Sequence, residues 1–225
     1  MNKNYKRIEV DDFYRKAQYE YFIAMDSPMI NITVNLDITD WNKRRKEAKK
    51  PFYLSLLYAV AQAANKVPAF RQRLVDGGIH EYENCPVSYT VDLESGAYSY
   101  NWLDSELDYE TFISLGRKQQ DELEKTQQFQ APEDGIRYLW FSSTPWFTYA
   151  NLDMPRSSKT YSEPIFLWGK AFEEQKLIEE NGSIHVQNLL KLPFTMVVNH
   201  VLVDGIHLKA ILEELEKYMD SMFQQ

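Results

Sequence analysis

Residues 192–222 read LPFTMVVNHVLVDGIHLKAILEELEKYMDSM, and this stretch joins two strongly patterned segments. The first, Leu192–Val203, is too apolar for a solvent-facing edge, so we expect a strand inside a sheet. The second, Ile206–Met222, repeats apolar residues at helical spacing, which predicts a helix with one buried face. Asp204-Gly205 stands between them, where the strand gives way to the helix.

Six further segments have a clear pattern. Strands are predicted where polar and apolar residues alternate or aromatic residues cluster, and helices where apolar residues recur at helical spacing. In chain order we expect a strand at Ile30–Ile38, a helix at Phe52–Asn65, a hairpin at Ala69–Tyr82, a helix at Tyr109–Gln128, and strands at Tyr138–Ser143 and Pro164–Trp168. This order predicts an α/β fold of the α+β type, a two-layer sandwich with helices on one face of a mixed, largely antiparallel sheet.

The composition is that of an ordinary globular protein, with 225 residues, 44% hydrophobic and 26% charged residues, and a net charge of −8. We expect one domain over residues 1–225. The longest apolar run, Leu56–Ala61, is too short to span a bilayer, and the charged N-terminus does not resemble a signal peptide, so we expect a cytoplasmic protein. The acidic balance argues against general nucleic-acid binding but leaves a local basic pocket for a small anion open.

Cysteine and histidine are scarce, with one Cys and four His. A single cysteine cannot form an internal disulfide, and so few ligands predict no metal site. We expect Cys85 to be a packing residue, His80 and His185 to be surface residues, and His207 to pack near the first turn of the last helix.

His200 differs from the other histidines because it directly follows the buried segment TMVVN. A histidine held at a strand end beside a cleft can take a proton from a hydroxyl near neutral pH. Asp204 can order the backbone around it, and Gly205 permits close approach. The residues alone leave two interpretations open: a general base, or a histidine satisfied in the core beside a strand-to-helix turn.

The segment His200-Val-Leu-Val-Asp204-Gly205 resembles the His-x-x-x-Asp-Gly motif of the chloramphenicol acetyltransferase family, a motif shared with dihydrolipoyl acyltransferases and peptide-synthetase condensation domains. Further similarities follow in the same order along nearly the whole chain. They are Phe13-Tyr14-Arg15-Lys16, Leu36-Asp37-Ile38-Thr39, Phe52-Tyr53, Phe70-Arg71-x-Arg73 with Asp76-Gly77, Tyr89-Thr90-Val91, Ser142, Pro145-Trp146, Pro164-Ile165-Phe166 and Gly169-Lys170.

The resemblance implies the chloramphenicol acetyltransferase fold and a homotrimeric, acetyl-CoA-dependent O-acetyltransferase with active sites between subunits. His200 would then be the general base that deprotonates the acceptor hydroxyl. Asp204 and Arg15 would form a buried ion pair that braces the site. Tyr53 and Lys170 would lie near the path of acetyl-CoA, and the acceptor would be chloramphenicol or a related small hydroxylated molecule.

The sequence departs from the family pattern on the acceptor side. Asn151 stands where the family has the serine that donates to the oxyanion; its amide could replace that donor, or it could simply form a turn. Leu167 replaces a threonine, and Phe22 falls where some members place a tyrosine at the antibiotic pocket. Asn199 stands where many members have a second histidine. The 21 residues between Lys170 and Leu192 are more than the family predicts, with a turn at Asn181-Gly182.

Two alternatives therefore remain beside acetylation of chloramphenicol or a related acceptor. One is an acyltransferase for an unrelated metabolite. The other is a catalytically degenerate, trimeric binding module. The joint presence of Arg15, His200 and Asp204 argues against the degenerate module, whereas the missing serine favours it.

Overall fold

The computed structural model describes residues 4–180 and 182–224. Runs of strands are separated by helices along the chain. The strands are β1 (Tyr5–Ile8), β2 (Met29–Asp37), β3 (Gln72–Val75), β4 (Gly78–Tyr82), β5 (Val87–Asp92), β6 (Tyr98–Leu103), β7 (Leu139–Thr144), β8 (Ile165–Gly169), β9 (Phe172–Glu180) and β10 (Ser183–Asn199). The helices are α1 (Lys16–Ile23), α2 (Thr39–Glu47), α3 (Phe52–Lys66), α4 (Pro68–Arg71), α5 (Tyr109–Thr126) and α6 (Gly205–Ser221), with a 3₁₀ turn at Val10–Asp12.

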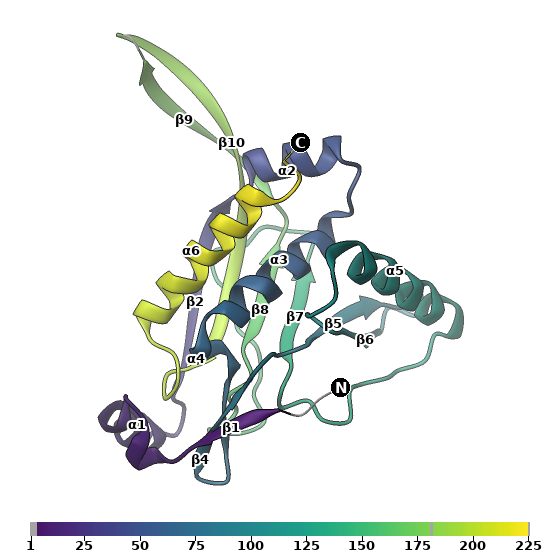
Figure 1. The fold of residues 1–225 in the computed structure, drawn as a ribbon. Helices are drawn as coiled ribbons and strands as arrows, with labels where there is room; N and C mark the ends of the chain where they lie inside the picture. Colours follow the sequence, from purple (N-terminus) through teal and green to yellow (C-terminus); the bar gives the residue numbers. More distant parts are fainter. Residues whose placement is uncertain (1–3, 181, 225) are drawn as a thin grey trace.

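The main sheet has the strand order β2-β10-β8-β7-β5-β6, and β9 pairs with the first half of β10. Only the β5–β7 and β7–β8 pairs are parallel among the described strands. Helices α3, α5 and α6 cover one face of this sheet (Figure 1). The predicted mixed, largely antiparallel sheet with helices on one face is confirmed.

The hydrophobic core lies between the helices and the sheet. Helix α3 is buried over most of its length because α5 and α6 flank it and the sheet lies beneath it. In β8, Phe166 and Trp168 point into this core, whereas Ile165 and Leu167 belong to a smaller cluster on the opposite face. Side chains of alternate residues in a strand point to opposite faces, so the sheet separates a helix-covered core from a second surface.

A small sheet, β1-β4-β3, contains the predicted hairpin. Asp76 and Gly77 both have positive φ angles, +47° and +70°, as the two central residues of a type I′ turn require. His80 on this hairpin is buried, with its ring stacked 3.9 Å from that of Tyr5, so the prediction of a surface histidine is wrong. Strand β1 pairs with β4 and covers it, a long-range pairing that the polar local sequence does not indicate.

The residues between Lys170 and Leu192 form a two-stranded ribbon, β9 and the first half of β10, that extends away from the body of the molecule (Figure 1). Gly182 has a φ angle of +75°, as expected at a turn, and Asn181 lies outside the described residues. Strand β10 ends at Asn199, not at Val203 as predicted. The residues beyond it are apolar because they are buried in a turn.

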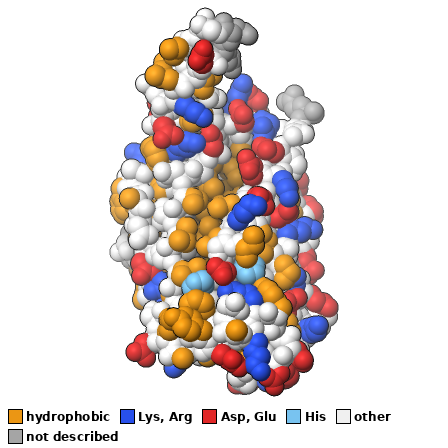
Figure 2. All heavy atoms as spheres, turned by 90° about the vertical axis from the view of Figure 1, so that its left-hand side faces the viewer, with side chains coloured by type: hydrophobic (Ala, Val, Ile, Leu, Met, Phe, Trp, Pro, Cys, Tyr) orange, Lys and Arg blue, Asp and Glu red, His pale blue; other side chains and the backbone are white. Residues whose placement is uncertain are grey.

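A groove of about 880 Å³ runs between β2 and α6, and Leu208, Leu212 and Ile32 are among its lining residues. Figure 2 shows apolar side chains gathered on this side of the molecule, with histidine, acidic and basic side chains below them.

Candidate active site

A tight turn follows β10 and carries His200. The backbone N–H groups of Leu202 and Val203 donate to the carbonyl of Asn199, and the N–H of His200 donates to Pro28 at 2.7 Å. The buried Asn199 side chain accepts from the N–H of Val201 and donates to the carbonyls of two residues in a neighbouring loop, Lys159 and Tyr161. Asparagine at this position therefore secures the turn through hydrogen bonds on both sides.

The imidazole of His200 is half-buried, and one of its nitrogens is tied to the backbone. Nδ1 lies 2.8 Å from the carbonyl oxygen of Val203. A carbonyl oxygen can only accept, so Nδ1 carries the hydrogen and Nε2 of the neutral ring has a free lone pair. The ring of Phe22, the predicted acceptor-side residue, packs against the imidazole with centroids 4.0 Å apart and the two planes tilted by 31°. The basic nitrogen is thus fixed in identity and in direction.

Arg15 and Asp204 meet beside this turn. The guanidinium of Arg15 is buried and donates to the carbonyl of Leu202 at 2.7 Å, to that of His200 at 3.4 Å, and to the Asp204 carboxylate at 3.4 Å. The Asp204 side chain, however, is 49% exposed in the single chain. The predicted pair forms, but only its arginine is buried.

Asp204 is also the N-cap of α6. Its carboxylate accepts the backbone N–H of Gly205 at 2.6 Å, and this bond, more than Arg15, holds the pKa of Asp204 below its usual range. The ring of His207 accepts the Asp204 backbone N–H at 2.9 Å, which completes a capping box. The other nitrogen of His207 lies 2.7 Å from the hydroxyl of Tyr14. His207 packs near the first turn, as expected, and Tyr14 is a site residue that sequence reasoning missed.

Asn151 and Leu167 lie on the sheet face that the helices leave free. The amide oxygen of Asn151 accepts the Thr33 hydroxyl at 3.1 Å, and Thr33 is 2.7 Å from Thr195. Leu167 is the register partner of Thr195 and is buried. Thr195 precedes His200 by five residues, which corresponds to roughly 16 Å along a strand. Within one chain, Asn151 and Leu167 are therefore distant from His200.

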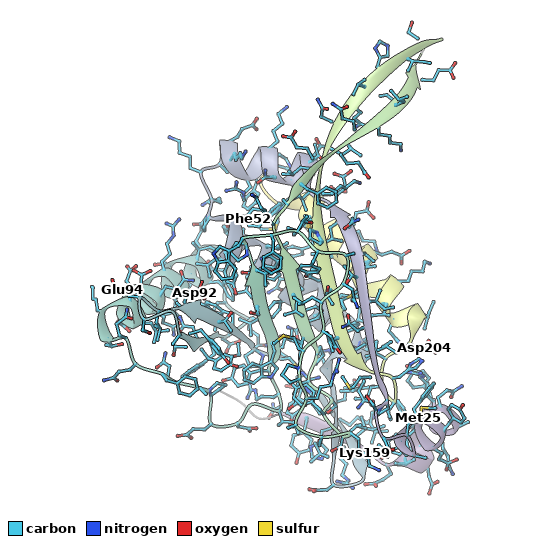
Figure 3. All side chains as sticks on the ribbon, turned by 180° about the vertical axis from the view of Figure 1, so that it is seen from behind. Met25, Phe52, Asp92, Glu94, Lys159 and Asp204 are labelled. Atoms are coloured by element: carbon cyan, nitrogen blue, oxygen red, sulfur yellow. The ribbon has the colours of Figure 1, made fainter. Side chains whose placement is uncertain are left out.

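Tyr53 and Lys170 also lie toward the end of the sheet away from His200. The Tyr53 ring is 5.1 Å from that of Trp168, and burial raises the pKa of its hydroxyl. Lys170 is exposed, and its backbone N–H donates to Phe147. Figure 3 shows the same separation, since Phe52, the neighbour of Tyr53, lies far from Asp204.

The predicted residues thus fall into two groups in a single chain. One group, at the end of β10, contains Arg15, Phe22, His200 and Asp204. The other lies toward the opposite end of the sheet, with Asn151 and Leu167 on its free face, Lys170 exposed at the end of β8, and Tyr53 on the helix side.

The model of the family described as chloramphenicol acetyltransferase matches residues 3–216. This chain belongs to the chloramphenicol acetyltransferase family. It is 26% identical over 222 residues to the chloramphenicol acetyltransferase of Escherichia coli, with 96% of this chain and 94% of the relative covered. It is also 26% identical over 220 residues to that of Campylobacter coli, with 96% and 99% covered.

Solved structures agree in fold. A chloramphenicol acetyltransferase superposes with a TM-score of 0.77 at 24% identity and covers 96% of this chain and 100% of its own. The dihydrolipoamide acetyltransferase of Azotobacter vinelandii gives a TM-score of 0.66 at 14% identity, with 92% of this chain and 86% of its own covered. Membership in the chloramphenicol acetyltransferase family makes the chain an acyltransferase, and the family uses acetyl-CoA as co-substrate.

Among residues 4–180 and 182–224, no three His, Cys, Asp or Glu side chains gather as metal ligands. In the same part of the chain, every helix is too short or too polar to cross a bilayer. Cys85 is buried and makes no disulfide, as expected of a packing residue.

Proposed function

We propose that this enzyme is an O-acetyltransferase that moves an acetyl group from acetyl-CoA to a hydroxyl of a small molecule, with His200 as the general base. The contact between Nδ1 of His200 and the Val203 carbonyl carries the proposal. This contact places the hydrogen on Nδ1 and leaves the lone pair on Nε2 to accept a proton. A general base needs a fixed lone pair of this kind.

In the reaction, the acceptor hydroxyl gives its proton to Nε2 while its oxygen attacks the carbonyl carbon of the thioester. The carbon–sulfur bond then breaks, and Nε2 returns the proton to the departing sulfur. His200 carries a positive charge between these two steps. Phe22 holds one face of the ring, and the turn after Asn199 holds its backbone, so the charge forms on a ring that does not reorient.

We further propose that the site is completed by a second subunit of a homotrimer. A separation of roughly 16 Å between Thr195 and His200 keeps the two groups of site residues apart within one chain. The loop that contains Asn151 also exposes two aromatic side chains, Trp146 and Phe147, at 65% and 52%. Exposed aromatic residues beside an incomplete site favour a protein partner at that surface.

In that arrangement, Asn151 of one subunit would donate to the oxyanion that forms beside His200 of another. Its amide oxygen accepts from Thr33, which leaves the NH₂ group as the donor. Tyr53 and Lys170 would line the path of acetyl-CoA. Helix α2 and the turn after it, directly before α3, add three exposed cations, Lys43, Lys46 and Lys49, which suit the phosphate groups of that co-substrate.

Chloramphenicol or a related molecule is the first acceptor to test. An unrelated, less polar metabolite is the second candidate, because Leu167 is buried in an apolar cluster with Val197 and Ile165, where it offers no hydroxyl to an acceptor.

The test is thiol release from acetyl-CoA with a panel of hydroxylated acceptors that includes chloramphenicol. For any acceptor that is acetylated, His200→Ala should keep its fold and lower kcat by at least roughly 10²- to 10⁴-fold, the usual loss of a general base. His185→Ala, at an exposed position on the ribbon, is the matched control. A His200→Ala enzyme with near-parental kcat would exclude this role. If none of the tested acceptors causes thiol release, the binding module is favoured.

A further inference from the structure

His200 is connected to a second histidine through a single peptide group. The carbonyl of Val203 accepts from Nδ1 of His200, and the N–H of the same peptide unit, that of Asp204, donates to Nδ1 of His207. The hydrogen-bond lengths are 2.8 Å and 2.9 Å. Because a peptide unit is planar, its two ends cannot turn independently, and displacing one hydrogen bond displaces the other.

These hydrogen bonds form a chain that continues to Tyr14 and has one direction throughout. Since Nδ1 of His207 accepts, the hydrogen of its neutral ring is on Nε2, which donates to the Tyr14 hydroxyl at 2.7 Å. Every donor therefore points the same way: from His200 to the peptide, from the peptide to His207, and from His207 to Tyr14. Aligned hydrogen bonds polarise one another, so each strengthens its neighbours.

We propose that His207 and Tyr14 are positioning residues that act on His200 through the Val203–Asp204 peptide. This inference rests on the proposed role of His200 as the base. When Nε2 of His200 takes the acceptor's proton, Nδ1–H becomes a stronger donor, and a chain aligned away from it stabilises the imidazolium. A buried aspartate does the same for the histidine of a serine-protease triad. Here a neutral chain supplies the stabilisation, and the nearby Asp204 carboxylate is left to cap α6 and pair with Arg15.

The surroundings permit the hydrogen-bond chain to be tested without disrupting the core. Tyr14 is 69% exposed and borders a cavity of about 600 Å³. The charged groups facing the two histidines are Arg15 and Asp204, and those on the cavity side are Lys6, Arg7, Asp12 and Glu81. Removing the Tyr14 hydroxyl changes none of these charges.

Three variants separate the links. Tyr14→Phe removes the last acceptor, His207→Gln keeps an acceptor for the Asp204 N–H but replaces the rigid ring donor to Tyr14 with a flexible amide, and His207→Leu removes both bonds. We expect Tyr14→Phe to lower kcat roughly 3- to 10-fold, the equivalent of one neutral hydrogen bond, with KM for acetyl-CoA within about twofold. The loss should increase from His207→Gln to His207→Leu. Tyr21→Phe, at an exposed tyrosine of α1, is the matched control and should have parental kcat.

Two measurements separate positioning from a purely structural cap. The hydrogen-bond chain stabilises the imidazolium of His200 that forms during the reaction. Removing its last links should therefore move the acid limb of the kcat–pH profile to lower pH. Ring ¹⁵N NMR should show His200 with its hydrogen on Nδ1 in the parent enzyme and a mixture of tautomers in His207→Leu.

The inference is wrong if Tyr14→Phe and His207→Gln leave kcat and the acid limb unchanged and His207→Leu leaves the His200 tautomer unchanged. A lower melting temperature of His207→Leu would not rescue it, because a structural cap alone explains that loss. The NMR measurement needs no acceptor. It therefore tests the link between the histidines even if no acetyl transfer is found, an outcome that would count against the proposed function alone.

Discussion

Asn151 is the residue at which this chain and its family differ most directly in chemistry. If its NH₂ group donates to the oxyanion, Asn151→Ala should lower kcat roughly 10²-fold with little change in KM, because the donor acts mainly in the transition state. Asn151→Ser should restore activity through the hydroxyl that the family uses. The measurement is steady-state thiol release, with Thr148→Ala in the same exposed loop as control. Unchanged kcat in Asn151→Ala would leave Asn151 as a turn residue.

Single residues also mark the limit of what the sequence could predict. The motif from His200 to Asp204 is local, so its turn could be anticipated. Tyr14 could not, because its partner His207 is 193 positions away and no pattern connects them. The burial of His80 cannot be predicted for the same reason, since Tyr5 of β1, from a distant part of the chain, stacks on its ring.

The start of helix α6 depends on Asp204, and its two roles can be separated. Asp204→Ala removes the N-cap and should lower the free energy of unfolding by about 1–2 kcal/mol. The larger cost of breaking a fully buried pair does not apply, because this carboxylate is 49% exposed. Asp204→Asn keeps a good capping residue and should cost less. Denaturant melts measure both, with Asp121→Ala, at an exposed position on α5, as control. Equal melts for the two variants would contradict a capping role.

The same carboxylate makes a pH-dependent contribution to stability. Its pKa is lowered in the folded state by the Gly205 N–H and then by Arg15, so the folded protein favours the ionised form. The contribution is complete above the unfolded pKa of about 3.9 and is lost as pH falls through the lower folded value. The stability difference between the parent and Asp204→Asn should therefore hold from pH 7 down to about pH 4 and shrink as the pH falls further. A difference that is constant with pH would argue against this electrostatic contribution.

Among the elements, periodicity predicts helices α3, α5 and α6 and strand β2, and aromatic clusters predict β7 and β8, all close to their observed bounds. The sequence also predicts the β3–β4 hairpin, because the turn chemistry of Asp76-Gly77 is local. The end of β10 was misplaced because burial makes a turn as apolar as a strand, and apolarity was the only signal available there.

The whole molecule should be a trimer in which each site takes His200 from one subunit and Asn151 from another. Co-expression of His200→Ala with Asn151→Ala chains then yields hybrid trimers in which one of the three active sites has both native residues. Activity should rise above that of either variant alone, to at most about one third of the parent. Light scattering should give the mass of three chains. A monomer mass, or no recovery in the hybrids, would contradict the shared site.

One domain over residues 1–225 also stays a prediction.

The two faces of the main sheet bear on how such an enzyme can change over generations. Its inner face carries Phe166, Trp168 and Phe194 of the core, and substitutions there alter the packing that holds the fold together. Its outer face carries Leu167 in a small separate cluster, beside the loop that contains Asn151. Substitutions on that side disturb fewer folding contacts. If the acceptor binds on that side, as proposed, selection can exchange one acceptor for another without changing His200, its turn or the core.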